Sequence, residues 1–167
     1  MADKEATVYI IDLGSTMADC HTGRIESDLD WSMRYVWDKI CTTVAANRKT
    51  WQIGVVGLRT AASKNPLAEA APETGYDNIS ILQEVGPMSM TSVRQLQTKI
   101  RPSDTMSGDA ISAIIIAAEM ISKAAPKRLK FKRTIILVTD GQGPIDADDF
   151  KEISSQLNNL GIQLLVM

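Results

Sequence analysis

The sequence predicts an α/β fold: a Rossmann-like, doubly wound and mostly parallel sheet with helices on both faces. Segments typical of strands alternate with segments whose apolar residues recur at helical spacing, and this alternation is typical of βαβ units. The strand segments are apolar on both faces, as in strands buried within a parallel sheet. The chain has 167 residues, 44% of them hydrophobic, so a single domain with a substantial core is expected.

Five segments are predicted to be strands. The first is rich in β-branched residues and ends near Asp12, and the second contains two glycines. The third is short and ends near Glu84, because the Gly-Pro pair that follows breaks a strand. The five predicted strands cover residues 7–13, 51–58, 79–82, 134–139 and 162–167.

Two helices are predicted in the first two thirds of the chain, each with an N-terminal capping residue. The first covers about residues 30–46, where apolar residues follow helical spacing and Asp30 can cap the N-terminus. The second is short and runs from a Thr91 or Ser92 cap to about Lys99. The polar segments around the first helix and the second strand, residues 14–29 and 60–78, are expected to be loops.

Two further helices are predicted near the C-terminus. Residues 108–124 are apolar almost all round, so this helix is expected to be buried against the sheet and other helices. The last helix can be capped by Asp148 or Asp149, and its apolar stripe runs from Phe150 to Leu160. Gly161 is expected to end it.

The charge balance and the cysteine content exclude several classes of protein. The formal net charge is −2, whereas a domain that bound nucleic acid alone would be strongly basic. Cys20 and Cys41 are too few for a disulfide framework and are expected to be reduced thiols of an intracellular protein. The N-terminus is polar, and no apolar run is long enough for a signal peptide or a membrane span.

Carboxylates and hydroxyls follow the predicted strand ends, where ligands of such sheets collect. Asp12 and Thr16 follow the first strand, Thr105 lies in a later loop, and Asp140 follows the fourth strand. Oxygen ligands of this kind suit Mg²⁺. The alternative interpretation is that Asp12 and Asp140 only accept hydrogen bonds from backbone donors at the strand ends.

These positions resemble the metal-ion-dependent adhesion site of the von Willebrand factor A family. The first motif of that family has Asp, then Ser two and four positions later. Asp12 and Thr16 match its first and third positions, Thr105 its second-loop threonine, and Asp140 its third-loop aspartate. Gly14 stands at the second position and has no hydroxyl. The resemblance therefore implies a degenerate site, with no metal and no cofactor expected.

The chain resembles more narrowly the N-terminal A-type domain of the larger subunit of Ku, in a fungal-like form. The resemblance covers essentially the whole chain. It rests on the order and spacing of several short motifs, namely residues 12–17, 23–27, 65–67, 75–79, 99–102 and 108–111. The family's domain continues further, so residues 1–167 are expected to be one von Willebrand factor A-like domain truncated at its C-terminus.

The resemblance to Ku implies a docking role in the nucleus. It implies non-homologous end joining at double-strand breaks, telomere maintenance, and a heterodimer with the smaller subunit. The family's DNA-encircling ring lies in a later domain, so DNA ends are expected to be bound by the full heterodimer. Repair-factor peptides with Ku-binding motifs are expected to bind at a surface that includes Leu67 and Tyr76. The alternative for these two residues is that they only close their own loop.

One cluster of basic residues lies between the third helix and the fourth strand. It can contact DNA phosphates or an acidic partner, or it can be a solvated connection that keeps the following strand soluble. The candidate patch comprises Lys127, Arg128, Lys130, Lys132 and Arg133, with Lys123 nearby.

Two other functions remain as alternatives. The first is a metal-dependent adhesion-type module that recruits a partner carboxylate. The second is the ATP-dependent DNA helicase activity attributed to the Ku family, and Asp12–Thr16 also resembles the phosphate loop of actin-like ATPases. In those ATPases a second, antiparallel strand follows directly, whereas here a polar loop and a long helix follow. No glycine-rich nucleotide-binding motif is present, and a single histidine leaves little for nucleophilic catalysis.

Overall fold

The computed structural model describes residues 4–72, 75–146, 148 and 150–167. Its centre is a five-stranded sheet in the order β3-β2-β1-β4-β5. The antiparallel β3 lies at one edge, and the other four strands are parallel, as the sequence predicts. The strands are β1 (Glu5–Asp12), β2 (Trp51–Leu58), β3 (Ile79–Pro87), β4 (Lys132–Val138) and β5 (Ile162–Val166).

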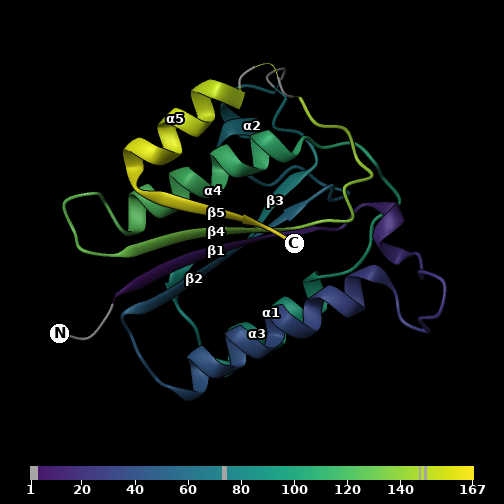
Figure 1. Ribbon diagram of the computed structural model, residues 1–167, viewed down its shortest axis with the longest axis horizontal. Coiled ribbons are helices and arrows are strands. Elements are labelled where there is room, and N and C mark those ends of the chain that lie inside the picture. Colours follow the sequence, from purple (N-terminus) through teal and green to yellow (C-terminus); the bar gives the residue numbers. More distant parts are fainter. Residues whose placement is uncertain (1–3, 73–74, 147, 149) are drawn as a thin grey trace.

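Helices cover both faces of the sheet, which confirms the predicted fold class (Figure 1). Helices α1 (Asp28–Ala45) and α3 (Met90–Lys99) lie on one face. On the other face lie α4 (Ala110–Ala124), α5 (Phe150–Leu160) and the short α2 (Pro66–Ala70). A single 3-10 turn, η1 (Ser15–Ala18), follows β1.

Each face of the sheet has its own buried core. Successive residues of a strand point to opposite faces, and β1 accordingly contributes Val8 and Ile10 to the α4 side and Tyr9 and Ile11 to the α1 side. Helix α4 buries eight of its fifteen residues, as expected for a helix that is apolar almost all round. Together these two cores hold the carboxyl ends of β1, β2 and β4 in fixed positions.

Several element boundaries differ from the prediction because a different side chain caps the helix. Ser27, not Asp30, caps α1, and the backbone N–H of Asp30 donates to its hydroxyl at 3.1 Å. Ser89, not Thr91 or Ser92, caps α3. The predicted cap Asp149 lies outside the described residues.

The predicted third strand and the loop before it are also more ordered than the sequence suggests. Strand β3 continues to Pro87, because an edge strand with an irregular register tolerates Gly86-Pro87. The loop expected over residues 60–78 contains α2, whose N-terminus is capped by Asn65.

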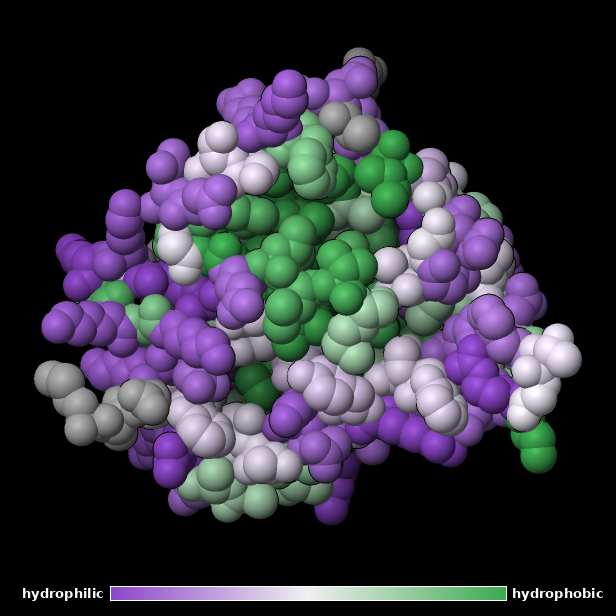
Figure 2. Space-filling view, viewed as in Figure 1, coloured by the Kyte–Doolittle hydropathy of each residue, from purple (hydrophilic) through white to green (hydrophobic). Residues whose placement is uncertain are grey.

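Strand β5 forms the second edge of the sheet, and no other strand of the described residues pairs with its outer side. Figure 2 shows an apolar area in the middle of this face, over β5 and the start of α5. The exposed large side chains of these two elements are Phe150 in α5 and Leu165 and Val166 in β5. None of the helices in the described part of the chain combines the length and apolar character of a membrane span.

Candidate functional site

The carboxyl ends of β1 and β4 lie side by side, because Ile11 of β1 is in register with Val138 of β4. Asp12 and Asp140, the two aspartates of the predicted site, come at or just after the ends of these strands. The pairing therefore brings both to the carboxyl end of the sheet. Asp12 is only 1% exposed. A carboxylate this deeply buried requires a partner for its charge.

That partner is Arg59, the residue directly after β2. Its guanidinium forms a buried ion pair with Oδ2 of Asp12, and Arg59 itself is 2% exposed. The other Asp12 contacts are hydrogen bonds: the Thr139 hydroxyl donates to Oδ2 at 2.6 Å, and the Gly14 backbone N–H donates to Oδ1 at 2.9 Å. The second terminal nitrogen of Arg59 donates to the carbonyl of Pro144 at 3.1 Å. Asp12 is thus already paired with a cation of the chain.

The other predicted ligands are used in local turns. The hydroxyl of Thr105 accepts a hydrogen bond from the backbone N–H of Ser107 at 3.0 Å. Asp140 accepts one from the backbone N–H of Gln142 at 3.0 Å. Thr16 lies half-buried in η1. Both aspartates therefore accept from backbone donors, as the alternative interpretation predicts, and Asp12 has a charged partner in addition.

Arg59 is the residue of this site that sequence reasoning missed. Its partner Asp12 is 47 positions away in the chain, and the periodicity of a strand does not show which way the next residue turns. One signal was available. Arg59 is the single charged residue at the end of an apolar strand that lies next to β1, and a buried cation there needs an anion nearby.

The two predicted peptide-binding residues lie on segments that are joined by hydrogen bonds of one buried side chain. Leu67 in α2 and Tyr76 are both partly buried against the core on the α4 side. Buried Asn65 links their segments: its amide nitrogen donates to the carbonyls of Tyr76 at 3.0 Å and Ile79 at 2.8 Å. Its amide oxygen accepts from the backbone N–H of Ala68 at 2.8 Å.

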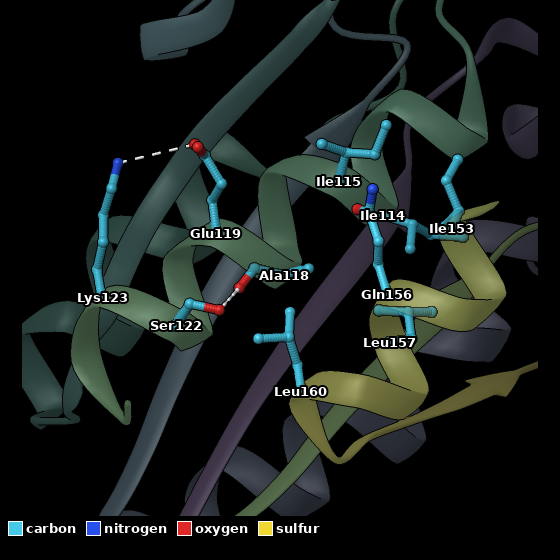
Figure 3. Close-up of a pocket in the computed structure, with 10 residues that line it drawn as sticks. All are labelled: Ile114, Ile115, Ala118, Glu119, Ser122, Lys123, Ile153, Gln156, Leu157 and Leu160. Carbon is cyan, nitrogen blue, oxygen red and sulfur yellow. Dashed lines mark hydrogen bonds and ion pairs between the residues drawn. The ribbon is translucent and has the colours of Figure 1, made fainter. Parts of the chain in front are cut away.

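A groove between α4 and α5 lies on this same face of the sheet, and the sequence analysis did not predict it. Its volume is about 290 Å³. Figure 3 shows its apolar side chains between the two helices, with Glu119 and Lys123 at one end. The apolar lining comprises Ile114, Ile115, Ala118, Ile153, Leu157 and Leu160. Ile115 and Ala118 are packed against the same core as Leu67 and Tyr76.

The structure removes Arg133 from the candidate basic patch. Arg133 is buried, and its guanidinium donates to four backbone carbonyls in the segment between α4 and β4: those of Ala125, Pro126, Leu129 and Phe131. It closes the end of α4 instead of facing solvent. The other four members, Lys127, Arg128, Lys130 and Lys132, are exposed.

Comparisons with known proteins identify the family. The model of the Ku70/Ku80 N-terminal alpha/beta domain matches residues 6–166. The chain is similar over its whole length to the ATP-dependent DNA helicase II subunit 2 of Neurospora crassa, at 59% identity, and of Chaetomium globosum, at 56%. It is 38% identical over 157 residues to the Schizosaccharomyces pombe protein of the same name. The chain spans only 22–23% of the length of these relatives.

Solved structures agree on the fold. The VWA domain of SpRpn10 superposes with a TM-score of 0.67 at 11% identity, over 98% of this chain and 74% of that one. An aerotolerance-related membrane protein from Bacteroides fragilis superposes with a TM-score of 0.60 at 18% identity, over 96% of this chain and 65% of that one. At these identities the likeness concerns the von Willebrand factor A-like fold alone. The family model that matches residues 6–166 and the similarity to these subunit 2 proteins show that the chain belongs to the Ku family, as the N-terminal α/β domain of the larger subunit.

Proposed function

We propose that this domain is a docking module of the larger Ku subunit in the nucleus. It recruits repair factors to double-strand breaks for non-homologous end joining, and it also serves telomere maintenance. The smaller subunit is its heterodimer partner, and DNA ends are bound by the heterodimer as a whole. Family membership over residues 6–166 supports this proposal.

The observation that carries the docking proposal is the surface around Leu67 and Tyr76. The two side chains are partly exposed on a frame that Asn65 ties together, and pre-formed apolar surfaces are where peptide anchors bind most tightly. Glu69, Glu84 and Lys64 line a hollow beside α2. Its two carboxylates outnumber its one lysine, which suits a basic, aromatic-containing Ku-binding motif.

The experiment is a binding assay on the full-length subunit with its partner, using a Ku-binding-motif peptide and a pull-down of repair factors. We expect Leu67→Arg to weaken binding by at least about tenfold, because it puts a charge into the apolar surface and repels a basic peptide. The matched control is Met90→Arg, an exposed position on α3 at the opposite face of the sheet. Equal recovery of repair factors by wild type and Leu67→Arg would dismiss the proposed surface.

The ATP-dependent helicase activity in the names of the relatives is the second candidate, as a property of the longer proteins. Within the described residues the sole histidine, His21, pairs with Asp28 at 2.8 Å and not with a nucleophile. Strand β2 runs parallel to β1, unlike the antiparallel strand that follows the phosphate loop of actin-like ATPases. These features favour docking over catalysis for this domain.

We also propose that further polypeptide covers the β5 edge in the longer proteins. Strand β5 exposes Leu165 and Val166, and unpaired apolar edge strands promote aggregation. The chain spans 22–23% of its relatives, so they contain ample sequence for such a cover.

A further inference from the structure

Arg59 stands at the position in the fold where the resemblance to A domains leads one to expect a metal ion. Its guanidinium pairs with the carboxylate of Asp12, the first residue of the matched motif. We propose that Arg59 is a built-in cation that replaces the divalent ion. The edge of the sheet therefore binds no divalent cation and offers no coordination position to a partner carboxylate.

The charges at this edge leave no place for a second cation. Both oxygens of Asp12 already accept hydrogen bonds, from Gly14 on one side and from Thr139 and Arg59 on the other. A divalent ion bound to Asp12 would lie against the guanidinium in a water-excluded site, where repulsion between like charges is strongest. Because Arg59 is 2% exposed, the guanidinium itself is out of reach of a partner.

Glycines surround the Arg59 side chain and make room for it. A Cβ on Gly14 would lie 2.9 Å from Cδ of Arg59, and a Cβ on Gly143 would overlap the guanidinium carbon. A Cβ on Gly108 would lie 3.2 Å from the Arg59 backbone nitrogen. The missing hydroxyl at position 14 therefore has a physical reason, because a side chain there would crowd Cδ of Arg59 and force the Arg59 side chain to shift.

The backbone conformation of Arg59 and the burial of its Nε atom both carry a cost in stability. Its φ of 58° lies in the left-handed region, which costs about 1 kcal/mol or more for a non-glycine residue. The hydroxyl of Ser103 donates to its carbonyl at 2.5 Å. Nε of Arg59 is buried without a hydrogen-bond partner among the described residues. The left-handed φ and the unsatisfied Nε both destabilise the fold, and the ion pair with Asp12 offsets them.

The test measures thermal unfolding of the 167-residue chain with EDTA, Mg²⁺ or Mn²⁺. We expect the Tm of wild type to be the same in all three. Arg59→Gly suits the left-handed backbone and is expected to lower the Tm by about 10 °C, because it leaves Asp12 buried and unpaired. Adding Gly14→Ser to Arg59→Gly restores the missing hydroxyl, and Mg²⁺ or Mn²⁺ is then expected to raise the Tm by several degrees, to the order of 5 °C.

Gly143→Ala supplies a test that needs no metal. It is expected to lower the Tm strongly when Arg59 is present and by less than about 1 °C in the Arg59→Gly background, because the two sites are in contact. An equal cost in both backgrounds would overturn the packing argument. The proposal that Arg59 replaces the ion would be wrong if Mg²⁺ raised the Tm of wild type. It would also be wrong if neither Mg²⁺ nor Mn²⁺ changed the Tm of the double variant.

If Arg59→Gly does not fold, wild type alone still decides the question. Mn²⁺ can be titrated into wild type and the free ion followed by electron paramagnetic resonance. Saturable binding of one ion with a sub-millimolar Kd would overturn the proposal, and the absence of saturable binding supports it.

Discussion

The proposed surface around Leu67 and Tyr76 depends on Asn65, a buried residue that is not itself part of the surface. Its amide makes three hydrogen bonds, one to the start of α2 and two to the segment of Tyr76 and Ile79. Asn65 is 2% exposed, so its amide is held by these partners within the protein. The positions of Leu67 and Tyr76 are therefore coupled through a residue that no peptide touches.

Asn65→Ala is expected to lower the free energy of unfolding by about 2–4 kcal/mol, because it removes a helix cap and takes a donor from the carbonyls of Tyr76 and Ile79. The Ile79 carbonyl keeps the backbone N–H of Lys64, at 3.1 Å. Urea unfolding of the chain measures this loss. Asn159→Ala, at an exposed position of α5, is the control and is expected to change stability by less than about 0.5 kcal/mol. A loss as small as that of the control would show that Asn65 does not hold the two segments together.

At the scale of elements, the junction of α4 and β4 depends on Arg133. Four carbonyls of the connecting segment accept hydrogen bonds from its guanidinium, which satisfies groups that the end of a helix leaves unpaired. The basic run in the sequence thus contains two kinds of residue. Arg133 is buried and holds the connecting segment through hydrogen bonds, whereas its neighbour Lys132 is exposed.

Arg133→Met keeps an unbranched apolar side chain and removes every donor of the guanidinium. We expect it to lower the free energy of unfolding by about 2–4 kcal/mol, since the carbonyls of Ala125 and Phe131 lose the guanidinium donor. The carbonyls of Pro126 and Leu129 still accept from backbone N–H groups. Lys132→Met, one position away and exposed, is the matched control with an expected change within about 0.5 kcal/mol. Equal stability of the two variants in denaturant unfolding would show that the hydrogen bonds of Arg133 do not stabilise the junction of α4 and β4.

The elements themselves were largely predictable, and their limits less so. The predicted strand over residues 51–58 matches β2, because an apolar run of this length between turn residues has few alternatives. The start of α1 was wrong by two residues, since Ser27 and Asp30 are both good caps and only the fold selects one. Asp12 and Asp140 could be predicted to share an edge because parallel strands align their ends. The partner of Arg59 was harder to predict, since a charged residue at the end of an apolar strand indicates that an anion lies nearby but not which one.

At the scale of the whole molecule, the net charge differs from the strongly basic charge typical of a domain that binds nucleic acid alone. The net charge is −2, and the exposed basic residues between α4 and β4 are a local exception. Without Arg133 the patch consists of Lys127, Arg128, Lys130 and Lys132. Its contribution to DNA affinity in the heterodimer is a hypothesis that salt dependence can test.

Neutralising Lys127, Arg128 and Lys130 is expected to flatten the dependence of DNA affinity on salt in the full heterodimer. Each phosphate contact that is lost reduces the slope of log K against log salt by about 0.9. The control neutralises three exposed lysines elsewhere, namely Lys39, Lys49 and Lys151. An unchanged slope would show that the patch is a solvated connection only.

The pairing of Arg59 with Asp12 has a consequence for how this surface can be regulated. A bound ion dissociates, and its occupancy follows the ion concentration of the compartment, so a metal-dependent surface has a loaded and an empty form. A guanidinium tethered to the backbone next to β2 is present at a fixed ratio of one per chain. The loops that meet around Asp12 and Pro144 therefore keep one arrangement whatever the supply of magnesium or calcium. On the docking function proposed above, the concentration of divalent ions is therefore not expected to control which partners bind.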